Sequence, residues 1–343
     1  MQMNKRSLIA ATALAALLAG LPLGAAAQGL TKIKFSLDWK FEGQTSFFFL
    51  AKAKGYFEQE GLDVTIDSGN GSAAAMTRIA SGAYDIALGD ISSLIEFSGN
   101  NPGPTRMQAV YQLYDELPLA YFALKKSGIK SITDFSGKSV ASANFEVTKK
   151  LFPMFAKMSR IDPATVKWVT IDPSLRVNMV LKGDADLCGG FYNATLEFNA
   201  RGIKTEDIAV IKVSDLGIRA YGNAVIASSK LIAENPKAVA GFVRATNRAF
   251  REGLADPAAS IKFLKAREPL VDEAIEVQRF AMMIPAMLTA RSYNNGLGSV
   301  SKLVLDTQVD DVAATFGTKV KPNPDVIFNS SFLPPKSERM PLK

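Results

Sequence analysis

The sequence predicts an α/β protein built as two α/β lobes joined by a hinge. Short β-rich runs alternate with helical stretches along the chain, which is typical of α/β architecture rather than of a β-sandwich or a helix bundle. The alternation restarts near residues 114–118, and strand character resumes after residues 214–222 before a long helical region. Two such crossings between lobes predict a hinge, with a ligand cleft between the lobes.

The first lobe begins with three strand–helix units. Its strands are expected at 33–37, 64–66 and 84–89, and its helices at 44–54, 72–81 and 91–98. In the first helix Phe47, Leu50 and Ala51 fall on one face, and Gly55 provides the C-terminal stop. Three units within about 70 residues imply right-handed parallel crossovers, which gather the ligand-facing loops at the carboxyl ends of the strands.

The second lobe repeats the alternation, and the chain then returns to the first lobe. Strands are expected at 119–124, 138–143, 166–171 and 186–190, helices at 147–159 and 174–182, and a closing run at 208–213. Residues 223–227 resume strand character. Asn235-Pro236 then opens a long helix, with proline at its first position where a missing N–H is no loss.

The predicted organisation has five parts. They are a signal peptide over 1–27, lobe 1 over 28–115, lobe 2 over 116–218, a mostly helical return to lobe 1 over 219–318, and a proline-rich extended tail over 319–343. The signal peptide is predicted because Lys5 and Arg6 precede an apolar run that ends at Ala25-Ala26-Ala27. We therefore expect an exported, periplasmic protein.

Composition excludes several kinds of chemistry. The chain has no histidine, which removes Ser–His and Cys–His nucleophile pairs, imidazole metal sites and the commonest neutral-pH general base. The single cysteine, Cys188, is expected to be a small core residue. The formal net charge is +7, with basic and acidic residues interspersed, so no nucleic-acid partner is expected. These features favour a binding protein without cofactor or metal over an enzyme.

Candidate ligand contacts in lobe 1 follow its strands. Trp39 comes at the carboxyl end of the first strand, where an indole provides a flat wall for stacking, and Glu42 in the same loop is a candidate partner for an amine or amidine. Asn70, Gly71 and Ser72 join a strand to a helix start, a geometry that suits a sulfonate or carboxylate. The third strand ends at Asp90, which caps a helix or contacts ligand.

Candidate contacts in lobe 2 occupy the equivalent loops across the cleft. Asn144 and Glu146 follow the strand at 138–143, and Phe191 and Tyr192 follow the strand at 186–190. Tyr192 is the preferred hydrogen-bonding lid residue. Together with Trp39, these aromatic rings favour an aromatic or aliphatic solute with an acidic group, and a neutral nitrogen heterocycle is the alternative.

Five segments resemble a known family of proteins. They are Asp38-Trp39, AKAKGYF at 51–57, EGLDV at 60–64, RIASGAYD at 78–85 and ITDFSGK at 132–138. Across about residues 31–260 the chain resembles bacterial solute-binding proteins related to thiamine-pyrimidine synthases and to alkanesulfonate, taurine and nitrate receptors. The resemblance implies a type II periplasmic-binding-protein fold and a monomeric receptor that delivers its solute to an ABC permease.

The chain also departs from the family. Members that bind thiamine pyrimidine precursors commonly carry an Asn-His element shortly after the Asp-Trp pair, whereas this chain has FEGQTS at 41–46. The eukaryotic relatives that make the pyrimidine consume a histidine and use a cysteine-rich iron motif, and neither is available here. Two further functions share the fold: an exported enzyme that uses Glu42 with Asp90 or Glu146 as an acid–base pair, and a sensory module.

Overall fold

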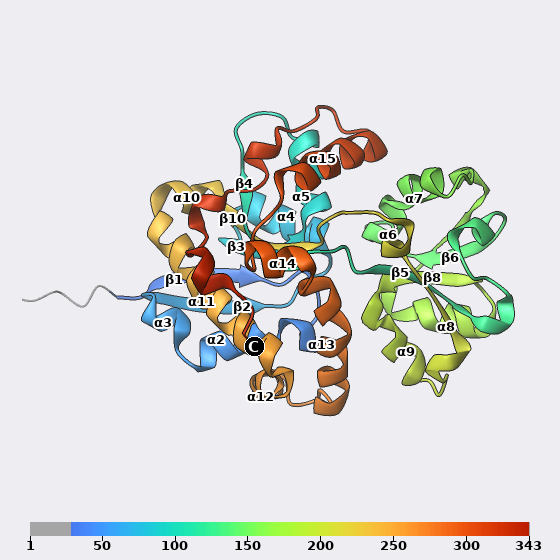
Figure 1. Ribbon diagram of the computed structural model, residues 1–343, viewed down its shortest axis with the longest axis horizontal. Helices are drawn as coiled ribbons and strands as arrows, with labels where there is room; N and C mark the ends of the chain where they lie inside the picture. Colours follow the sequence, from blue (N-terminus) through green and yellow to red (C-terminus); the bar gives the residue numbers. More distant parts are fainter. Residues whose placement is uncertain (1–28, 343) are drawn as a thin grey trace, which may run out of the picture.

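The computed structural model describes residues 29–342 and places them in two lobes, each built on a five-stranded sheet (Figure 1). The predicted signal peptide lies outside the described residues. The lobes are joined by residues 113–118 and 213–222, which connect the two sheets. Within the described residues no helix has the length and apolar character needed to cross a bilayer.

The sheet of lobe 1 has the strand order β2-β1-β3-β10-β4. Its strands are β1 (Thr31–Ser36), β2 (Leu62–Asp67), β3 (Ile86–Asp90), β4 (Met107–Gln112) and β10 (Asn223–Ser228). As predicted, β1 pairs in parallel with β2 and β3, whereas β10 runs antiparallel to β3 and β4. Residues 38–42, 68–72 and 90–91 therefore meet at one edge of the sheet, which faces the other lobe.

The sheet of lobe 2 repeats this arrangement in the order β7-β6-β8-β5-β9. Its strands are β5 (Leu119–Leu124), β6 (Ser139–Ser142), β7 (Lys167–Thr170), β8 (Leu187–Phe191) and β9 (Ile208–Lys212). The strand β6 is parallel to β7 and β8, and β5 is antiparallel to β8 and β9. The loops after β6 and β8 consequently lie at a common edge.

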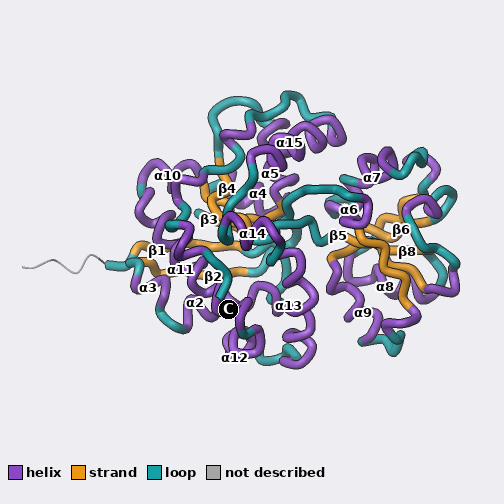
Figure 2. Tube along the Cα trace, in the orientation of Figure 1, coloured by secondary structure: helices purple, strands orange, loops and turns teal. Residues whose placement is uncertain are grey.

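Helices cover both sheets (Figure 2). In lobe 1 they are α2 (Ser46–Ala53), α3 (Tyr56–Gln59), α4 (Ser72–Ala80), α5 (Ile91–Asn100), α10 (Ser229–Glu234), α11 (Pro236–Ala255), α12 (Pro257–Arg267), α13 (Glu273–Met287), α14 (Ala290–Asn295) and α15 (Lys302–Phe316). In lobe 2 they are α6 (Val147–Lys150), α7 (Phe152–Met158), α8 (Arg176–Lys182) and α9 (Thr195–Asn199). Short 3-10 helices, among them Gly43–Thr45 and Tyr192–Ala194, begin several loops.

Aromatic packing fixes the start of lobe 1. Phe35 of β1 lies with its ring centroid 4.7 Å from that of Phe48 on α2 and 5.1 Å from that of Phe242 on α11. All three side chains are buried. Because the strand is held from this face by two helices, the loop that follows it has a defined position at the edge of the sheet.

The structure differs from the predicted elements in several places, and it contains the short helices α3 and α9, which were not predicted. The helix expected over 147–159 is divided into α6 and α7, because Pro153 lacks a backbone N–H and stands near the start of a new helix. The strand β4 was not predicted. Instead of an extended tail, residues 319–342 contain 3-10 helices at Pro324–Val326, Ser330–Phe332 and Lys336–Arg339 and pack on lobe 1, where Ile327 is fully buried and Phe328 forms a bridge with Ala109 of β4.

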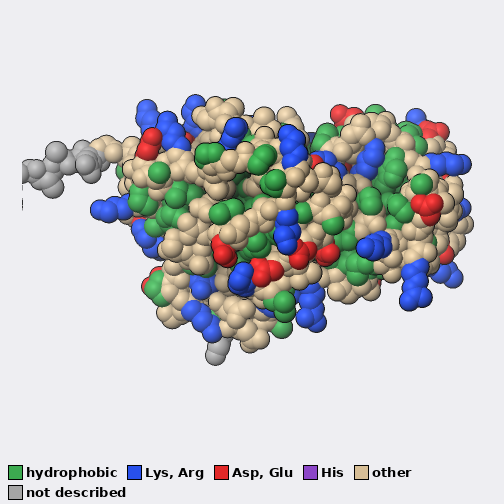
Figure 3. All heavy atoms as spheres, turned by 90° about the horizontal axis from the view of Figure 1, so that it is seen from above, with side chains coloured by type: hydrophobic (Ala, Val, Ile, Leu, Met, Phe, Trp, Pro, Cys, Tyr) green, Lys and Arg blue, Asp and Glu red, His purple; other side chains and the backbone are tan. Residues whose placement is uncertain are grey.

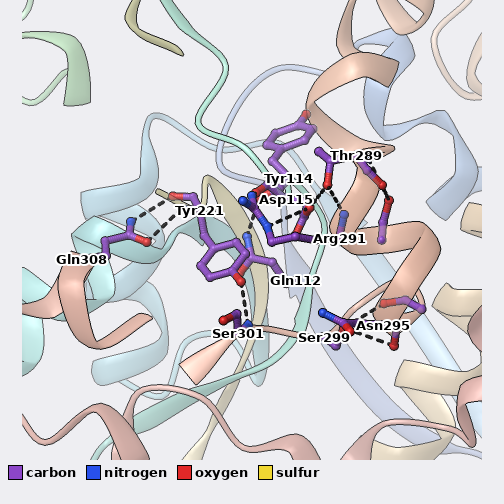
Figure 4. A network of polar contacts seen from close by, with 12 residues as sticks. Gln112, Tyr114, Asp115, Tyr221, Thr289, Arg291, Asn295, Ser299, Ser301 and Gln308 are labelled. Atoms are coloured by element: carbon purple, nitrogen blue, oxygen red, sulfur yellow. Dashed lines mark hydrogen bonds and ion pairs between the residues drawn. The ribbon is translucent and has the colours of Figure 1, made fainter. Parts of the chain in front are cut away.

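A polar network ties the first connection between the lobes to α14 (Figure 4). The Asp115 carboxylate accepts a hydrogen bond from Thr289 Oγ1 and pairs with Arg291 Nε at 3.2 Å. Arg291 also donates to the main-chain oxygen of Asp115. These contacts fix the first connection to lobe 1.

The second connection is fixed to the same lobe. Gln308 of α15 accepts from Tyr221 N at 2.8 Å and donates to Tyr221 O at 2.9 Å, while Ser301 N donates to the Tyr221 hydroxyl at 2.6 Å (Figure 4). The Arg291 guanidinium lies over the Tyr221 ring. Arg291 thus contacts both connections, and they start from one shared anchor in lobe 1.

Candidate functional site: a cleft between the lobes

A cavity of about 120 Å³ lies between the two lobes. It is lined from lobe 1 by residues of the loops after β1 and β2 and by α13, and from lobe 2 by the loops after β6 and β8 and by α8 and α9. The lining residues are Asp38, Trp39, Lys40, Glu42, Gln44, Thr45, Gly71, Ser72, Tyr114, Leu119, Phe145, Glu146, Val147, Thr148, Arg176, Gly190, Phe191, Asn193, Glu197, Asn223 and Arg279.

Six of the ten predicted contact residues line this cavity. They are Trp39, Glu42, Gly71, Ser72, Glu146 and Phe191. Their meeting follows from sheet topology, because each belongs to a loop at the carboxyl end of a strand and these ends face one another across the gap.

The other four predicted residues do not line the cavity. Asn70 is exposed, and Asp90 caps α5 by accepting from Ser92 N at 2.7 Å. Asn144 accepts from Lys149 Nζ at 2.6 Å, which turns its amide toward α6. Tyr192 makes a hydrogen bond with Ser214 at 3.1 Å and so belongs to the connection between the lobes rather than to a lid over the cavity.

The Asp38 carboxylate occupies the part of lobe 1 that the sequence suggested for an anionic ligand group. Its Oδ2 accepts from Ser72 Oγ at 3.2 Å, at the first residue of α4, and from Asn223 Nδ2 at 2.7 Å. Gly71 N donates to the main-chain oxygen of Asp38 at 2.6 Å. A carboxylate of the protein itself therefore already stands at this helix start, where a second anion is repelled.

Burial perturbs two acids beneath the cavity. Removal from water raises the pKa of Asp38 to about 6, although hydrogen bonds from Asn223 and Ser72 oppose the change. Burial likewise raises the pKa of Asp90 to about 7, against the hydrogen bonds from Ser92, and the negative charge of Asp38 adds to the increase. Both shifts have one main cause, because the charged form of a carboxyl group is disfavoured in a site removed from water.

Arg176 of α8 is held between two glutamates of lobe 2. Its guanidinium makes a two-point contact with Glu197 and lies 3.4 Å from Glu146 Oε1. The second oxygen of Glu146 accepts from Ser142 Oγ at 2.5 Å and Ala143 N at 2.7 Å. Burial alone would lower the pKa of Arg176, but the two carboxylates raise it overall, so the group remains charged and paired.

Arg279 of α13 has a similar environment in lobe 1. Its Nε lies 3.1 Å from Glu276 Oε2, and its Nη1 lies 3.9 Å from Glu42 Oε1. Glu276 also accepts from Gly43 N at 2.6 Å, which joins α13 to the loop after β1. The only arginines that line the cavity formed by the described residues are these two, and both are already paired with carboxylates.

Neutral polar groups in the same cavity lack partners. Among residues 29–342, the buried atoms Gln44 Oε1, Thr148 Oγ1, Asn193 Nδ2 and Asn223 Oδ1 have no hydrogen-bond partner. Glu42 accepts from the Gln44 amide nitrogen at 2.9 Å and Asp38 accepts from the Asn223 amide nitrogen, so both amide oxygens remain as acceptors. Buried groups of this kind are usually paired, so these four atoms are candidate contacts for a ligand.

Aromatic rings form the walls of the cleft. Trp39 and Phe145 reach the cavity from opposite lobes, and Tyr114 and Phe191 lie edge to face with their centroids 6.0 Å apart. A Cβ atom added at Gly71 would lie 3.1 Å from Phe145 Cδ2, so the lobes touch at this point. Such walls fit a flat or apolar molecule.

Several lining residues have no signal in the sequence. Arg176, Glu197 and Arg279 come from three helices, and Asn223 from the return strand, so only the folded chain brings them together. Asp38 and Phe145 were detectable from the sequence. Asp38 directly precedes the predicted contact Trp39, and Phe145 lies between the predicted contacts Asn144 and Glu146. The thiol of Cys188 is fully buried and burial raises its pKa to about 12, in agreement with its prediction as a core residue.

Comparison with known proteins confirms the resemblance seen in the sequence. Residues 43–260 match the family model described as NMT1/THI5 like. The chain is 26% identical over 268 residues to a 4-amino-5-hydroxymethyl-2-methylpyrimidine phosphate synthase from Aspergillus parasiticus, covering 73% of this chain and 74% of that protein. It is 23% identical over 282 residues to the riboflavin-binding protein RibY from Chloroflexus aurantiacus, covering 78% and 76%.

Solved structures confirm the predicted fold. The periplasmic aliphatic sulphonate binding protein SsuA from Escherichia coli matches with a TM-score of 0.70 and 14% identity, covering 89% of this chain and 94% of that chain. At this level of identity the similarity establishes the periplasmic-binding-protein fold alone.

Proposed function

Because the chain belongs to the NMT1/THI5-like family, we propose that it is a periplasmic solute receptor that closes over a small neutral nitrogen heterocycle and delivers it to an ABC permease. The two lobes bind opposite faces of the ligand, and contacts to both favour the closed form. The observation that carries the choice of ligand is the pairing of both cavity arginines with glutamates while neutral amide and hydroxyl atoms lack partners.

Charge distinguishes this ligand class from the sulfonate or carboxylate that the sequence favoured. The cavity is lined by four carboxylates, Asp38, Glu42, Glu146 and Glu197, against three cationic side chains, Lys40, Arg176 and Arg279. An acidic ligand would have to displace an existing ion pair, which is costly in a site removed from water. A neutral heterocycle avoids this cost.

Hydrogen bonding and shape support the same class. The acceptor oxygens of Gln44 and Asn223 belong to lobe 1, whereas Thr148 and Asn193 belong to lobe 2 and supply donors. A ring with an amino group on one edge and a ring nitrogen on the other satisfies both sets. Trp39 and Phe145 provide apolar faces for such a ring.

Receptor and enzyme make different predictions for the bound molecule. Asp90, one candidate partner of Glu42 in the alternative acid–base pair, makes its hydrogen bond to Ser92 N rather than lining the cavity, whereas Glu42 and Glu146 both line it. The receptor releases an unaltered ligand, and the enzyme releases an altered one.

The test begins with native mass spectrometry of the purified protein, which identifies any co-purified molecule. A thermal-shift series then compares 4-amino-2-methylpyrimidine and riboflavin with butanesulfonate and benzoate. We expect the melting temperature to rise with a heterocycle and not with the anions, because a ligand that binds only the folded state stabilises it. Stabilisation by the anions alone would refute the proposal, and recovery of a chemically altered heterocycle would show an enzyme.

A further inference from the structure

Glu197 pairs with one of the two arginines of the cleft. It lies on α9 of lobe 2 and makes a two-point contact with Arg176 of the same lobe. Arg279 lines the same cavity from lobe 1, on α13, and this helix packs against residues 192–194 directly before α9. Glu197 and the second arginine therefore reach one cavity from opposite lobes.

The two arginines have different carboxylate partners. Arg279 Nε lies 3.1 Å from Glu276 Oε2 and its Nη1 lies 3.9 Å from Glu42 Oε1, so both of its partners belong to lobe 1. Burial lowers the pKa of Arg279, but Glu42 and Glu276 raise it overall, and Glu197 adds a smaller contribution. Arg176 is paired with Glu197 and Glu146, so Glu197 holds the side of its guanidinium that the acid group of a ligand would contact.

We propose that Glu197 is the specificity-determining residue for ligand charge: its carboxylate substitutes for the acid group of a ligand, and thereby excludes sulfonates and carboxylates from the cleft. This inference deepens the proposed function, since it assigns the preference for a neutral ligand to one side chain. Removal of that charge leaves Arg176 with Glu146 alone, at 3.4 Å, while Arg279 keeps Glu276 and Glu42. The guanidinium of Arg176 then presents unpaired N–H groups to an incoming anion.

The experiment is isothermal titration of the folded protein and its variants with butanesulfonate and benzoate. Glu197→Gln retains the size of the side chain and removes its charge, so we expect at least about tenfold tighter anion binding than in the unaltered protein. Glu206→Gln is the matched control, because Glu206 lies in the same lobe, its side chain is 74% exposed, and it pairs only with Lys204. It should leave anion binding unchanged.

A double variant separates selectivity from general loosening of the cleft. Adding Arg176→Met to Glu197→Gln removes the cation that Glu197 contacts and should abolish most of the gain in anion affinity. If Glu197→Gln does not fold, Glu197→Ala carries the same expectation, since alanine favours the helical conformation. Failure of both to fold would overturn the proposal by making Glu197 a structural requirement.

The remaining outcomes are equally decisive. Unchanged anion affinity in Glu197→Gln, or a gain that persists after Arg176→Met, would refute the role of Glu197. Titration with 4-amino-2-methylpyrimidine is a separate readout. Absence of heterocycle binding in the unaltered protein counts against the proposed function, while a gain of anion binding in Glu197→Gln still supports the role of Glu197.

Discussion

Asn223 donates its side-chain amide to Asp38 Oδ2 at 2.7 Å, and so joins the first residue of the return strand β10 to the loop after β1. The two residues are 185 positions apart in the sequence. Both are buried, and both line the cleft. The hydrogen bond fixes the carboxylate that stands at the start of α4, and it explains why this part of the cleft bears its own negative charge.

Stability should fall as pH rises, because burial raises the folded-state pKa of Asp38 to about 6 and of Asp90 to about 7, above their ordinary value of 3.8. Each acid contributes stability that is fully present below about pH 4 and is lost as pH rises through its folded pKa. We expect a loss on the order of 2–4 kcal/mol from Asp90 between pH 4 and pH 8, measured by urea unfolding. Asp90→Asn should weaken the dependence of the free energy of unfolding on pH. An unchanged pH dependence in this variant would contradict the assignment of the effect to Asp90.

Trp39 should report ligand binding. The sequence contains two tryptophans, and Trp168 of β7 packs on Phe152 in lobe 2, so a Trp168→Phe variant emits from Trp39 alone. Its fluorescence should change on addition of 4-amino-2-methylpyrimidine. Trp39→Ala should weaken binding about tenfold through lost stacking without unfolding the protein, as checked by circular dichroism. Unchanged affinity in this variant would remove Trp39 from the site.

Gly71 should be required for closure of the cleft. Its φ of 102° is unfavourable for other residues, and an added Cβ would lie 3.1 Å from Phe145 Cδ2 of the opposite lobe. We expect Gly71→Ala to lower ligand affinity and to enlarge the radius of gyration of the ligand-bound protein in small-angle scattering.

Gly61→Ala is the matched control for Gly71. Gly61 has a φ of 75° with nothing within 4 Å of an added Cβ, so alanine there strains the backbone without touching the other lobe. Both variants should lose about 1–2 kcal/mol of stability, but only Gly71→Ala should lose affinity. Adding Phe145→Ala to Gly71→Ala should restore closure. Equal loss of affinity in both single variants would show that strain alone is responsible.

The anchor of the hinge should depend on Arg291. Its side chain is 24% exposed and that of Asp115 is 10% exposed, so Arg291→Met leaves a nearly buried carboxylate unpaired. We expect a loss of about 3 kcal/mol in the free energy of unfolding, measured by urea denaturation. Lys302→Met removes an exposed pair with Asp306 and should change stability by less than about 0.5 kcal/mol. Similar losses in the two variants would contradict a special role for the anchor.

Charged side chains are spread over both lobes on the face seen in Figure 3. This distribution fits the interspersed charge pattern of the sequence. The charges that we propose to select the ligand are instead those inside the cleft, where removal from water increases the energy of each interaction.

Local sequence determined the alternation of strands and helices, and with it the loops at the carboxyl ends of the strands that contain Trp39, Gly71 and Glu146. These features can be predicted because the signals for them are local. Hydrophobic periodicity, the glycines that end helices and the prolines that begin them each act over a few residues. Where local signals were weak, prediction of the elements from the sequence failed. The strand β4 was missed, and Pro153 divided a predicted helix.

Tertiary structure alone decided the charge of the cleft. Arg176, Glu197, Arg279 and Asn223 come from four separate elements, and each lies within the cavity only because two sheets and α13 bring them there. The sequence suggested an anionic ligand at the helix start of Gly71-Ser72, but the folded chain places Asp38 at that point. Packing between segments that are distant in the sequence decides which charged side chains come together. Local patterns in a single sequence do not predict these contacts.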